Sequence, residues 1–271
     1  MTDMSGQVIK ILSIDGGVIR GLIPALILEE LERRLIAISK KRPFATIFDL
    51  VAGTSTGALI ALGLVLLQAD NAVSRGLGHG SVPVLSLGDI IDFYTKRGPE
   101  VFFPMRNAAR ASSAAPAFSP PALISPLPER GERFSLIDGA IFANNPSLLA
   151  YIEAKKIFPE AKDFLILSLS AGDDTAGFPY TEIEKWGFIE WVNPLKRMPL
   201  LSMISAGQSE SVNHMLKRIA GLCYFCFSGP LEVANPAIDD SSQLNIAALR
   251  DTARHIIDDY EEHIELLCEA W

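Results

Sequence analysis

The chain has 271 residues, of which 49% are apolar and 21% are charged, a globular composition with enough length for one large core. Acidic residues outnumber basic residues by 32 to 24, so the net charge is −8 at pH 7. This balance argues against non-specific nucleic-acid binding, which needs a basic surface, and provides no general attraction to anionic membranes. Only a local patch would support peripheral membrane contact.

The N-terminal residues and the apolar runs predict a cytoplasmic protein. The start, Met-Thr-Asp-Met-Ser-Gly, has neither the basic segment nor the apolar segment of a signal peptide. The longest apolar run, Ala58 to Leu67, is shorter than the roughly 20 residues that a bilayer-spanning helix needs.

Two strand–helix units are predicted in the first quarter of the chain. The run Val8 to Ile14 is rich in β-branched residues and indicates a strand, and Leu22 to Ile38 has the spacing of an amphipathic helix. The short apolar run Leu50 to Ala52 suits a buried strand, and Ala58 to Leu67 is long enough for a helix. Two such units in succession predict a parallel sheet covered by helices.

The middle of the chain is predicted to contain mostly connections. The stretch 71–86 is rich in Gly and Ser, and Leu87 to Lys96 indicates a short helix. The proline-rich stretch after the small, polar segment Ala108 to Ala115 indicates a loop. Arg133 to Ile137 is strand-like and ends on Asp138-Gly139.

The last part of the chain continues the alternation of helices and strands. The predicted elements are a helix at Pro146 to Ile157, a strand at Phe164 to Leu169, helical segments between Ile183 and His214 broken at Pro194 and Pro199, a strand at Leu222 to Phe227, and one long amphipathic helix at Leu244 to Trp271. There is no internal repeat and no shift in composition. The sequence therefore predicts a single α/β domain over residues 1–271.

The cysteines do not indicate a disulfide framework. Cys223 and Cys226 have the spacing of a metal or redox pair, but they lie in an apolar strand, where residues three apart point to opposite faces. A second pair of metal ligands is also missing. We expect buried structural cysteines here.

The stretch Gly53-Thr-Ser55-Thr-Gly57 lies between the second predicted strand and its helix. A serine on such a sharp turn is the nucleophile-elbow arrangement, and the two glycines allow the tight turn. The helix that follows directs its free N–H groups and the positive end of its dipole toward charge that develops at the serine.

A serine nucleophile needs a base that accepts its proton. The histidine candidates, none of which follows a strand, are His79, His214, His255 and His263. The carboxylate candidates are Asp15 and Asp138, which both follow strands and precede glycine. Sites in open parallel sheets lie at the carboxyl ends of strands, so both aspartates are expected at the same edge as Ser55.

The loop after the first strand has glycines that direct backbone N–H groups at one point. Gly16 and Gly17, followed by Val18, suit a phosphate cradle or an oxyanion hole. The loop lacks the Gly-Lys-Ser/Thr of a P-loop and the full G-x-G-x-x-G of a dinucleotide site, so an oxyanion hole for Ser55 fits better.

Three ordered motifs together resemble those of patatin-like phospholipases. They are Asp15-Gly-Gly-Val-Ile-Arg-Gly21, Gly53-Thr-Ser-Thr-Gly57 and Asp138-Gly-Ala-Ile-Phe-Ala-Asn-Asn-Pro146. The segment Ala109 to Pro116 is similar to the family's segment before the aspartate. The resemblance runs from Ile11 to about Ser170, and more loosely to the C-terminal helix.

The resemblance implies a three-layer α/β/α fold with a mostly parallel sheet and a lipid acyl hydrolase that needs no metal or organic cofactor. Ser55 would be the nucleophile and Asp138 its only base. The oxyanion hole would be formed at Gly16, Gly17 and Val18. Arg20 matches the basic residue of the glycine loop and is expected to hold that loop or contact an anionic headgroup of the lipid substrate. The oligomeric state is left open.

The chain departs from the family at two places. Val18 stands where the family has a third glycine, and it would be strained if the position needs φ > 0. The stretch between Phe103 and Ala109 is shorter than expected, which implies an open or a disabled site. The alternatives are therefore a catalytically impaired binding or regulatory protein on the same fold, and a Ser-His-Asp esterase.

An acyl pocket is expected near the serine. The aromatic residues predicted to line it are Phe102, Phe103, Phe118 and Phe142.

Overall fold

The central sheet is parallel, as the sequence predicts. The computed structural model describes residues 8–38, 44–64, 105–125, 133–174, 177–193 and 198–271. In these residues the sheet has the order β2-β1-β5-β6, and all three neighbouring pairs are parallel. Its strands are β1 (Ile9–Ile14), β2 (Leu50–Gly53), β5 (Phe164–Leu169) and β6 (Leu222–Phe227). Each coincides with a predicted strand to within one residue.

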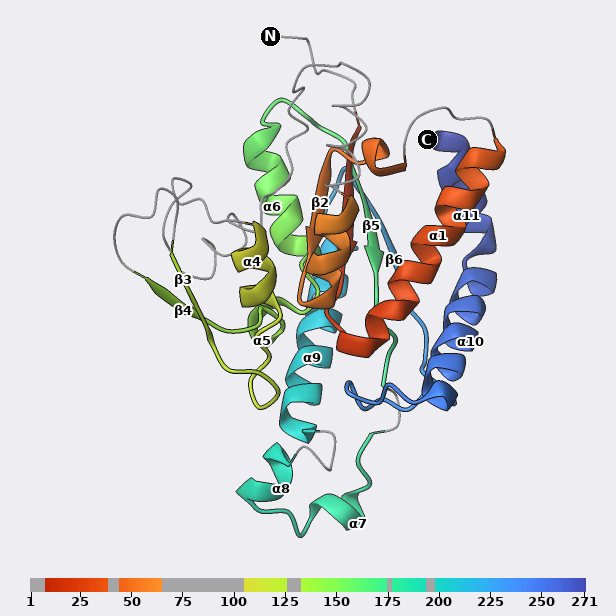
Figure 1. Ribbon diagram of the computed structural model, residues 1–271. Coiled ribbons are helices and arrows are strands. Elements are labelled where there is room, and N and C mark those ends of the chain that lie inside the picture. The colour runs from red at the N-terminus through yellow and green to blue at the C-terminus, as the bar shows by residue number, and fades with distance from the viewer. Residues whose placement is uncertain (1–7, 39–43, 65–104, 126–132, 175–176, 194–197) are drawn as a thin grey trace.

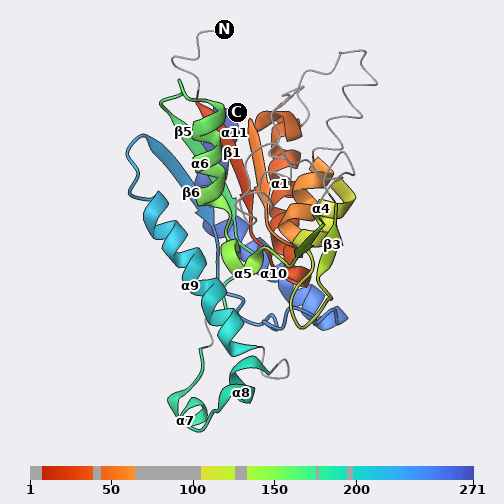
Figure 2. The same cartoon turned by 90° about the vertical axis from the view of Figure 1, so that its left-hand side faces the viewer.

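Helices cover both faces of this sheet (Figures 1 and 2). One face carries α1 (Leu22–Ala37), α10 (Gln243–Asp259) and α11 (Glu261–Ala270). The other carries α6 (Ser147–Ile157) and α9 (Pro199–Leu216). The arrangement is the predicted three-layer α/β/α fold.

The side chains of β1 contribute to two parts of the hydrophobic core, one on each face of the sheet. Leu12 and Ile14 of β1 pack with α1, α10 and α11. Ile9 and Ile11 of the same strand pack with α6 and α9. Because successive side chains of a strand point to opposite faces, a sheet buried on both sides requires apolar residues at successive positions, as at Ile11 and Leu12.

The predicted long C-terminal helix is in fact two helices. α10 ends at Asp259 and α11 begins at Glu261, and Tyr260 between them has φ −105° and ψ 17°, outside helical geometry. The Tyr260 ring packs on Phe227 of β6, with ring centroids 4.6 Å apart. We attribute the break to this contact, and the change of direction keeps Ile264 and Leu267 buried in the core.

The proline-rich stretch that the sequence predicts to be a loop contains one strand. A helix, α4 (Met105–Ser112), precedes this stretch and buries Ala108 and Ala111. After Pro121, β3 (Ala122–Ile124) pairs antiparallel with β4 (Phe134–Leu136) in a separate two-stranded sheet. The sequence does not predict β3, because a strand of three residues is too short to show the alternation of buried and exposed side chains. The predicted connection 71–86 and the predicted helix Leu87–Lys96 lie outside the described residues.

An arm projects beyond the carboxyl ends of the strands (Figures 1 and 2). It contains α7 (Tyr180–Ile183) and α8 (Phe188–Val192) and leads into α9, which begins at Pro199 as predicted. Within the described residues, no helix is both long and apolar enough to cross a membrane.

The cysteines differ in part from the prediction. Cys268 is buried and Cys226 is partly buried, but Cys223 is exposed. Cys223 lies on β6, the edge strand of the described sheet, which is less completely covered.

Two glycines allow the strand–turn–helix around Ser55 to fit against β1. A Cβ atom at Gly57 would lie 2.3 Å from the carbonyl oxygen of Ile14, and one at Gly53 would lie 2.3 Å from the carbonyl oxygen of Gly57. Backbone on both sides leaves no room for a methyl group.

We expect Gly57→Ala to lower the free energy of unfolding by at least about 1–3 kcal/mol, because overpacking against backbone forces a main-chain shift. Gly207 of α9 is the matched control, since its Cβ would meet nothing within 4 Å. Gly207→Ala should stabilise the protein by up to about 1 kcal/mol through helix propensity. Urea denaturation measures both; equal effects would contradict the close approach at Gly57.

Candidate active site

Ser55 lies on the turn between β2 and a helix that covers residues 56–64 of the described chain. It is buried and has φ 53°, a left-handed conformation that serine rarely adopts. Its backbone N–H donates to the Ser112 hydroxyl of α4 at 3.0 Å. Such strain at one residue persists only where surrounding contacts hold it, as in a nucleophile elbow.

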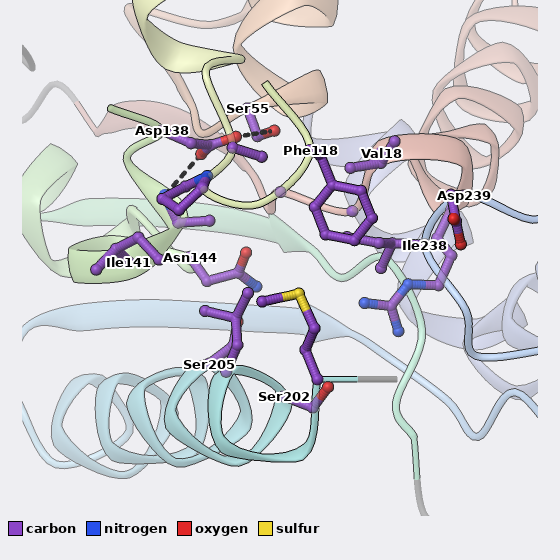
Figure 3. Close-up of a pocket in the computed structure, with 18 of the residues that line it drawn as sticks. Val18, Ser55, Phe118, Asp138, Ile141, Asn144, Ser202, Ser205, Ile238 and Asp239 are labelled. Atoms are coloured by element: carbon purple, nitrogen blue, oxygen red, sulfur yellow. Dashed lines mark hydrogen bonds between the residues drawn. The ribbon is translucent and has the colours of Figure 1, made fainter. Parts of the chain in front are cut away.

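The Ser55 hydroxyl donates a hydrogen bond to Asp138, with 2.7 Å between Oγ and Oδ2 (Figure 3). The other carboxylate oxygen of Asp138 accepts the N–H of Ala140 at 2.8 Å. The Asp138 backbone N–H donates to the carbonyl of Ala114 at 2.9 Å. Both oxygens of this buried carboxylate are therefore held, one by the serine and one by the backbone that follows.

The strand before Asp138 belongs to a different sheet from the one predicted. We expected Asp138 at the end of a strand in the parallel sheet. It instead follows β4, which belongs to the separate β3–β4 sheet, and precedes the short helix α5 (Ala140–Ala143). The sequence pattern identified the strand before Asp138 but did not show which sheet that strand joins.

Burial makes Asp138 a stronger base than an exposed aspartate. Desolvation raises the pKa of its carboxyl group, and the hydrogen bonds from Ala140 and Ser55 oppose that rise. A carboxylate with a raised pKa accepts a proton more readily, as a base for a serine hydroxyl must.

The glycine loop lies beside Ser55, at the end of β1. The N–H of Gly16 donates to the Asn144 carbonyl at 3.2 Å, and the N–H of Gly17 donates to the Thr56 hydroxyl at 3.2 Å. Val18 lines the same pocket as Ser55 and has φ 49°. The Gly16 N–H is thus engaged with backbone, which leaves Gly17 and Val18 as the better candidates for an oxyanion hole.

Asp15 and Arg20 lie at the two ends of this loop. Asp15 is 4% exposed. Its Oδ1 atom has no hydrogen-bond partner in the described part of the chain, and the same holds for the buried Nε atom of Arg20. Burial, and then the charge of Asp173, raise the pKa of Asp15 well above its ordinary value. Burial lowers the pKa of Arg20, which the charges of Asp174 and Asp173 oppose.

An apolar pocket of about 100 Å³ opens at Ser55 and Asp138 (Figure 3). Its apolar lining residues include Pro116, Phe118, Ile141, Met198, Leu201 and Ile238. Of the predicted lining residues, Phe118 is confirmed. Phe142 is not among the residues that line this pocket and is half exposed, because its neighbour Ile141 occupies the wall instead. Phe102 and Phe103 lie outside the described residues.

The sequence missed the pocket residues that come from distant elements. Met198, Leu201 and Ser202 lie at the start of α9, and Ile238 lies in the connection after β6. No motif marks these residues. Only their position near the carboxyl ends of the strands would have indicated them.

The described histidines lie away from Ser55. His214 is exposed near the end of α9, His255 contacts Glu232 with 3.4 Å between Nδ1 and Oε2, and His263 packs on Phe225. None of these three lines the pocket. His79 lies outside the described residues.

Metal coordination has no obvious place in the described chain, where no group of three or more His, Cys, Asp or Glu side chains is arranged to hold a metal ion.

The strain at Val18 gives a test of the loop conformation. A left-handed φ costs a non-glycine residue about 1–2 kcal/mol, whereas glycine costs about 0.5–1 kcal/mol in chain entropy. We expect Val18→Gly to keep or raise the free energy of unfolding. Val233→Gly is the control, at an exposed valine without positive φ, and should destabilise the protein. Destabilisation by Val18→Gly to the same extent would contradict the left-handed conformation.

Comparisons with known proteins agree with the motifs. The model of the patatin-like phospholipase family matches residues 12–77. Patatin-like protein 2 of Arabidopsis thaliana is 27% identical in an alignment that covers 79% of this chain and 72% of the relative. Patatin-like protein 1 of Oryza sativa subsp. indica is 26% identical, over 77% and 70%. Probable inactive patatin-3-Kuras 1 of Solanum tuberosum is 26% identical, over 71% of each chain. The resemblance is thus confirmed: this chain is similar to patatin-like proteins over most of its length.

Proposed function

We propose that this protein is a serine hydrolase that cleaves carboxylic esters of phospholipids or related lipids with a Ser55–Asp138 dyad, as a single domain over residues 1–271. The observation that carries the proposal is the 2.7 Å hydrogen bond from a serine on a strained strand–helix turn to a buried carboxylate. The similarity to patatin-like phospholipases supports a hydrolase.

The dyad performs the reaction in two steps. Ser55 Oγ attacks the ester carbonyl carbon while its proton passes to Asp138. The tetrahedral intermediate collapses when the protonated Asp138 gives that proton to the leaving alkoxide, which departs as an alcohol. Water then attacks the acyl-enzyme, Asp138 takes the water's proton and returns it to Ser55 Oγ, and a free carboxylic acid is released.

The negative oxygen of each tetrahedral intermediate needs donors that are already in place. We assign this role to the N–H groups of Gly17 and Val18. The Gly17 N–H is bonded to a side-chain hydroxyl, Thr56 Oγ1, which can rotate away at little cost. The start of the helix at residue 56 adds the positive end of its dipole.

The lining of the pocket supports a lipid substrate. The apolar side chains around Phe118 and Ile238 suit an acyl chain. Arg20 lines the same pocket, and its Nε atom has no hydrogen-bond partner among the described residues. We assign Arg20 to contact with an anionic part of the substrate, such as a phosphate.

The arm of α7 and α8 supports peripheral contact with a membrane surface. Tyr180, Phe188 and Ile189 are 73%, 79% and 72% exposed. Packing of Trp186 against Phe178 and Trp191, at 5.2 Å between centroids in each case, holds the arm together. Aromatic side chains favour the lipid–water interface, and the arm precedes α9 in the chain, whose first residues line the pocket. We propose that the arm contacts the surface from which substrate is taken.

A binding or regulatory protein is the second candidate. The strained Val18 and the Gly17 N–H already bonded to Thr56 favour it, because they describe an oxyanion hole that is not fully formed. Labelling of Ser55 by a fluorophosphonate separates the candidates, since only an activated serine reacts. A Ser-His-Asp esterase would require His79, because the described histidines lie away from the pocket.

We expect Asp138→Asn to lower kcat/KM for a p-nitrophenyl ester by at least about 10²–10⁴-fold, because asparagine keeps the shape but cannot accept the proton. Ser55→Ala lacks the proposed nucleophile and gives the background rate of the assay. His214→Ala, His255→Ala and His263→Ala are controls that should retain most of the activity. The pH profile of the parent should rise through one group with a pKa above the ordinary aspartate value of about 3.9, since only ionised Asp138 is a base and burial raises its pKa. An active Ser55→Ala or Asp138→Asn enzyme would end the dyad proposal.

The arm is tested with the double variant Phe188→Ser/Ile189→Ser. Removing two large apolar side chains from the interface should weaken binding to phosphatidylcholine vesicles at least about tenfold, since burial of each stabilises by about 1.5–3 kcal/mol. The matched control is Ile36→Ser/Leu266→Ser, which alters residues 68% and 60% exposed on α1 and α11. Vesicle sedimentation measures both. Equal binding by the two double variants would contradict the role of the arm.

A further inference from the structure

A second cavity lies next to the catalytic pocket, behind the glycine loop. It measures about 350 Å³. The two cavities share lining residues that include Arg20, Asn144, Ser202 and Ser205, and Figure 3 shows the last three on the side of the catalytic pocket away from Ser55. The second cavity therefore continues the site in which the ester is cleaved.

The lining of this second cavity is polar, in contrast to the acyl pocket. Among the described residues, its lining has four carboxylates and one guanidinium group, from Asp15, Asp173, Asp174, Glu210 and Arg20. Its other polar groups come from Asn144, Asn213, Ser170, Ser202, Ser205, Ser209 and Ser228. A site with this composition takes a polar group from water and offers it hydrogen bonds in return.

Two of the charged groups each have one buried atom that finds no hydrogen-bond partner among the described residues. Asp15 is 4% exposed, and its Oδ1 atom has no hydrogen-bond partner in the residues described. The same is true of Arg20 Nε. A buried polar atom without a partner is costly, and such atoms in a cavity are candidates for ligand contact.

The charges in the cavity act on one another. The charge of Glu210 raises the pKa of Asp173, after the larger effect of burial, and the charge of Arg20 lowers it. The charge of Asp173 in turn raises the pKa of Asp15. The acidic groups thus form one cluster, and Arg20 is the one cation among the described residues that line the cavity, at the border with the catalytic pocket.

We infer that this cavity is the headgroup subsite of the enzyme and that it selects zwitterionic phospholipids whose head carries a cationic amine. The phosphate lies at Arg20, on the border of the two cavities, and the amine lies among Asp173, Asp174 and Glu210. The ester at Ser55 then stands between an acyl chain in the apolar pocket and a head in the polar cavity. The inference rests on the proposed function for the identity of the reaction.

The charge balance decides between possible heads. An anionic head would bring further negative charge to the four carboxylates, which like-charge repulsion disfavours. A neutral sugar head would use the serine hydroxyl groups but would add no positive charge to that of Arg20. In a head with a phosphate and an amine, the phosphate can pair with Arg20 at one end of the cavity and the amine with the carboxylates at the other.

The test compares hydrolysis of phosphatidylcholine, phosphatidylglycerol and digalactosyldiacylglycerol with identical acyl chains in neutral detergent micelles. We expect the parent to favour phosphatidylcholine over phosphatidylglycerol by about tenfold or more in kcat/KM. The double variant Asp174→Asn/Glu210→Gln should lower this ratio at least about tenfold, because it removes two charges that attract the amine. Asp259→Asn/Glu265→Gln removes the same charges from exposed positions on α10 and α11 and should leave the ratio unchanged.

A binding measurement separates the subsite from the chemistry. Calorimetry with the Ser55→Ala protein should detect glycerophosphocholine but not glycerol 3-phosphate, and Asp174→Asn/Glu210→Gln should weaken the former at least about tenfold. If glycerophosphocholine binds but a fluorophosphonate does not label the parent protein, the catalytic proposal is overturned and the subsite is supported. Ester hydrolysis with a headgroup ratio unmoved by the double variant would overturn the subsite alone. Preference for the galactolipid would also overturn it, in favour of a sugar-binding cavity.

Discussion

The hydrogen bond between Ser55 and Asp138 joins residues 83 positions apart in the chain, and the local structure around it serves to hold that contact. The serine side is fixed by the glycine fit against β1 and by the bond from its N–H to Ser112. The aspartate side is fixed by the bond from its N–H to Ala114. Ser112 is the last residue of α4 and Ala114 lies two residues later, so one short segment at the end of α4 positions both Ser55 and Asp138.

Further bonds connect the dyad to the glycine loop. The Thr54 hydroxyl donates to the Ala143 carbonyl at 2.7 Å, and the Gly16 N–H donates to the next carbonyl, that of Asn144. The end of α5 therefore connects the turn that contains Ser55 with the glycine loop. A change in any of these segments should alter the backbone conformation of Ser55, because its left-handed φ depends on contacts with all of them.

The parts of the fold that the sequence predicts are those with a local signal. The largely apolar sequences of β1 and β5 reflect burial on both faces of the sheet, and Ser55 is indicated by a turn that only glycines permit. The β3–β4 sheet and the break at Tyr260 depend on distant partners, a facing strand in one case and Phe227 in the other. Such contacts leave no periodic pattern in the sequence. For the same reason, the sequence does not predict that Met198 and Ile238 line the pocket.

A dyad places a demand on its base that a triad shares between two residues. In a triad, a histidine accepts the proton and a separate carboxylate orients it. In the proposed dyad Asp138 must do both, so its orientation has to come from the backbone. The N–H of Ala140 supplies it at 2.8 Å, and that bond also lowers the pKa that burial raises. Position and basicity are therefore coupled: a tighter bond to Ala140 fixes the carboxylate but weakens the base, and the burial of Asp138 offsets that loss.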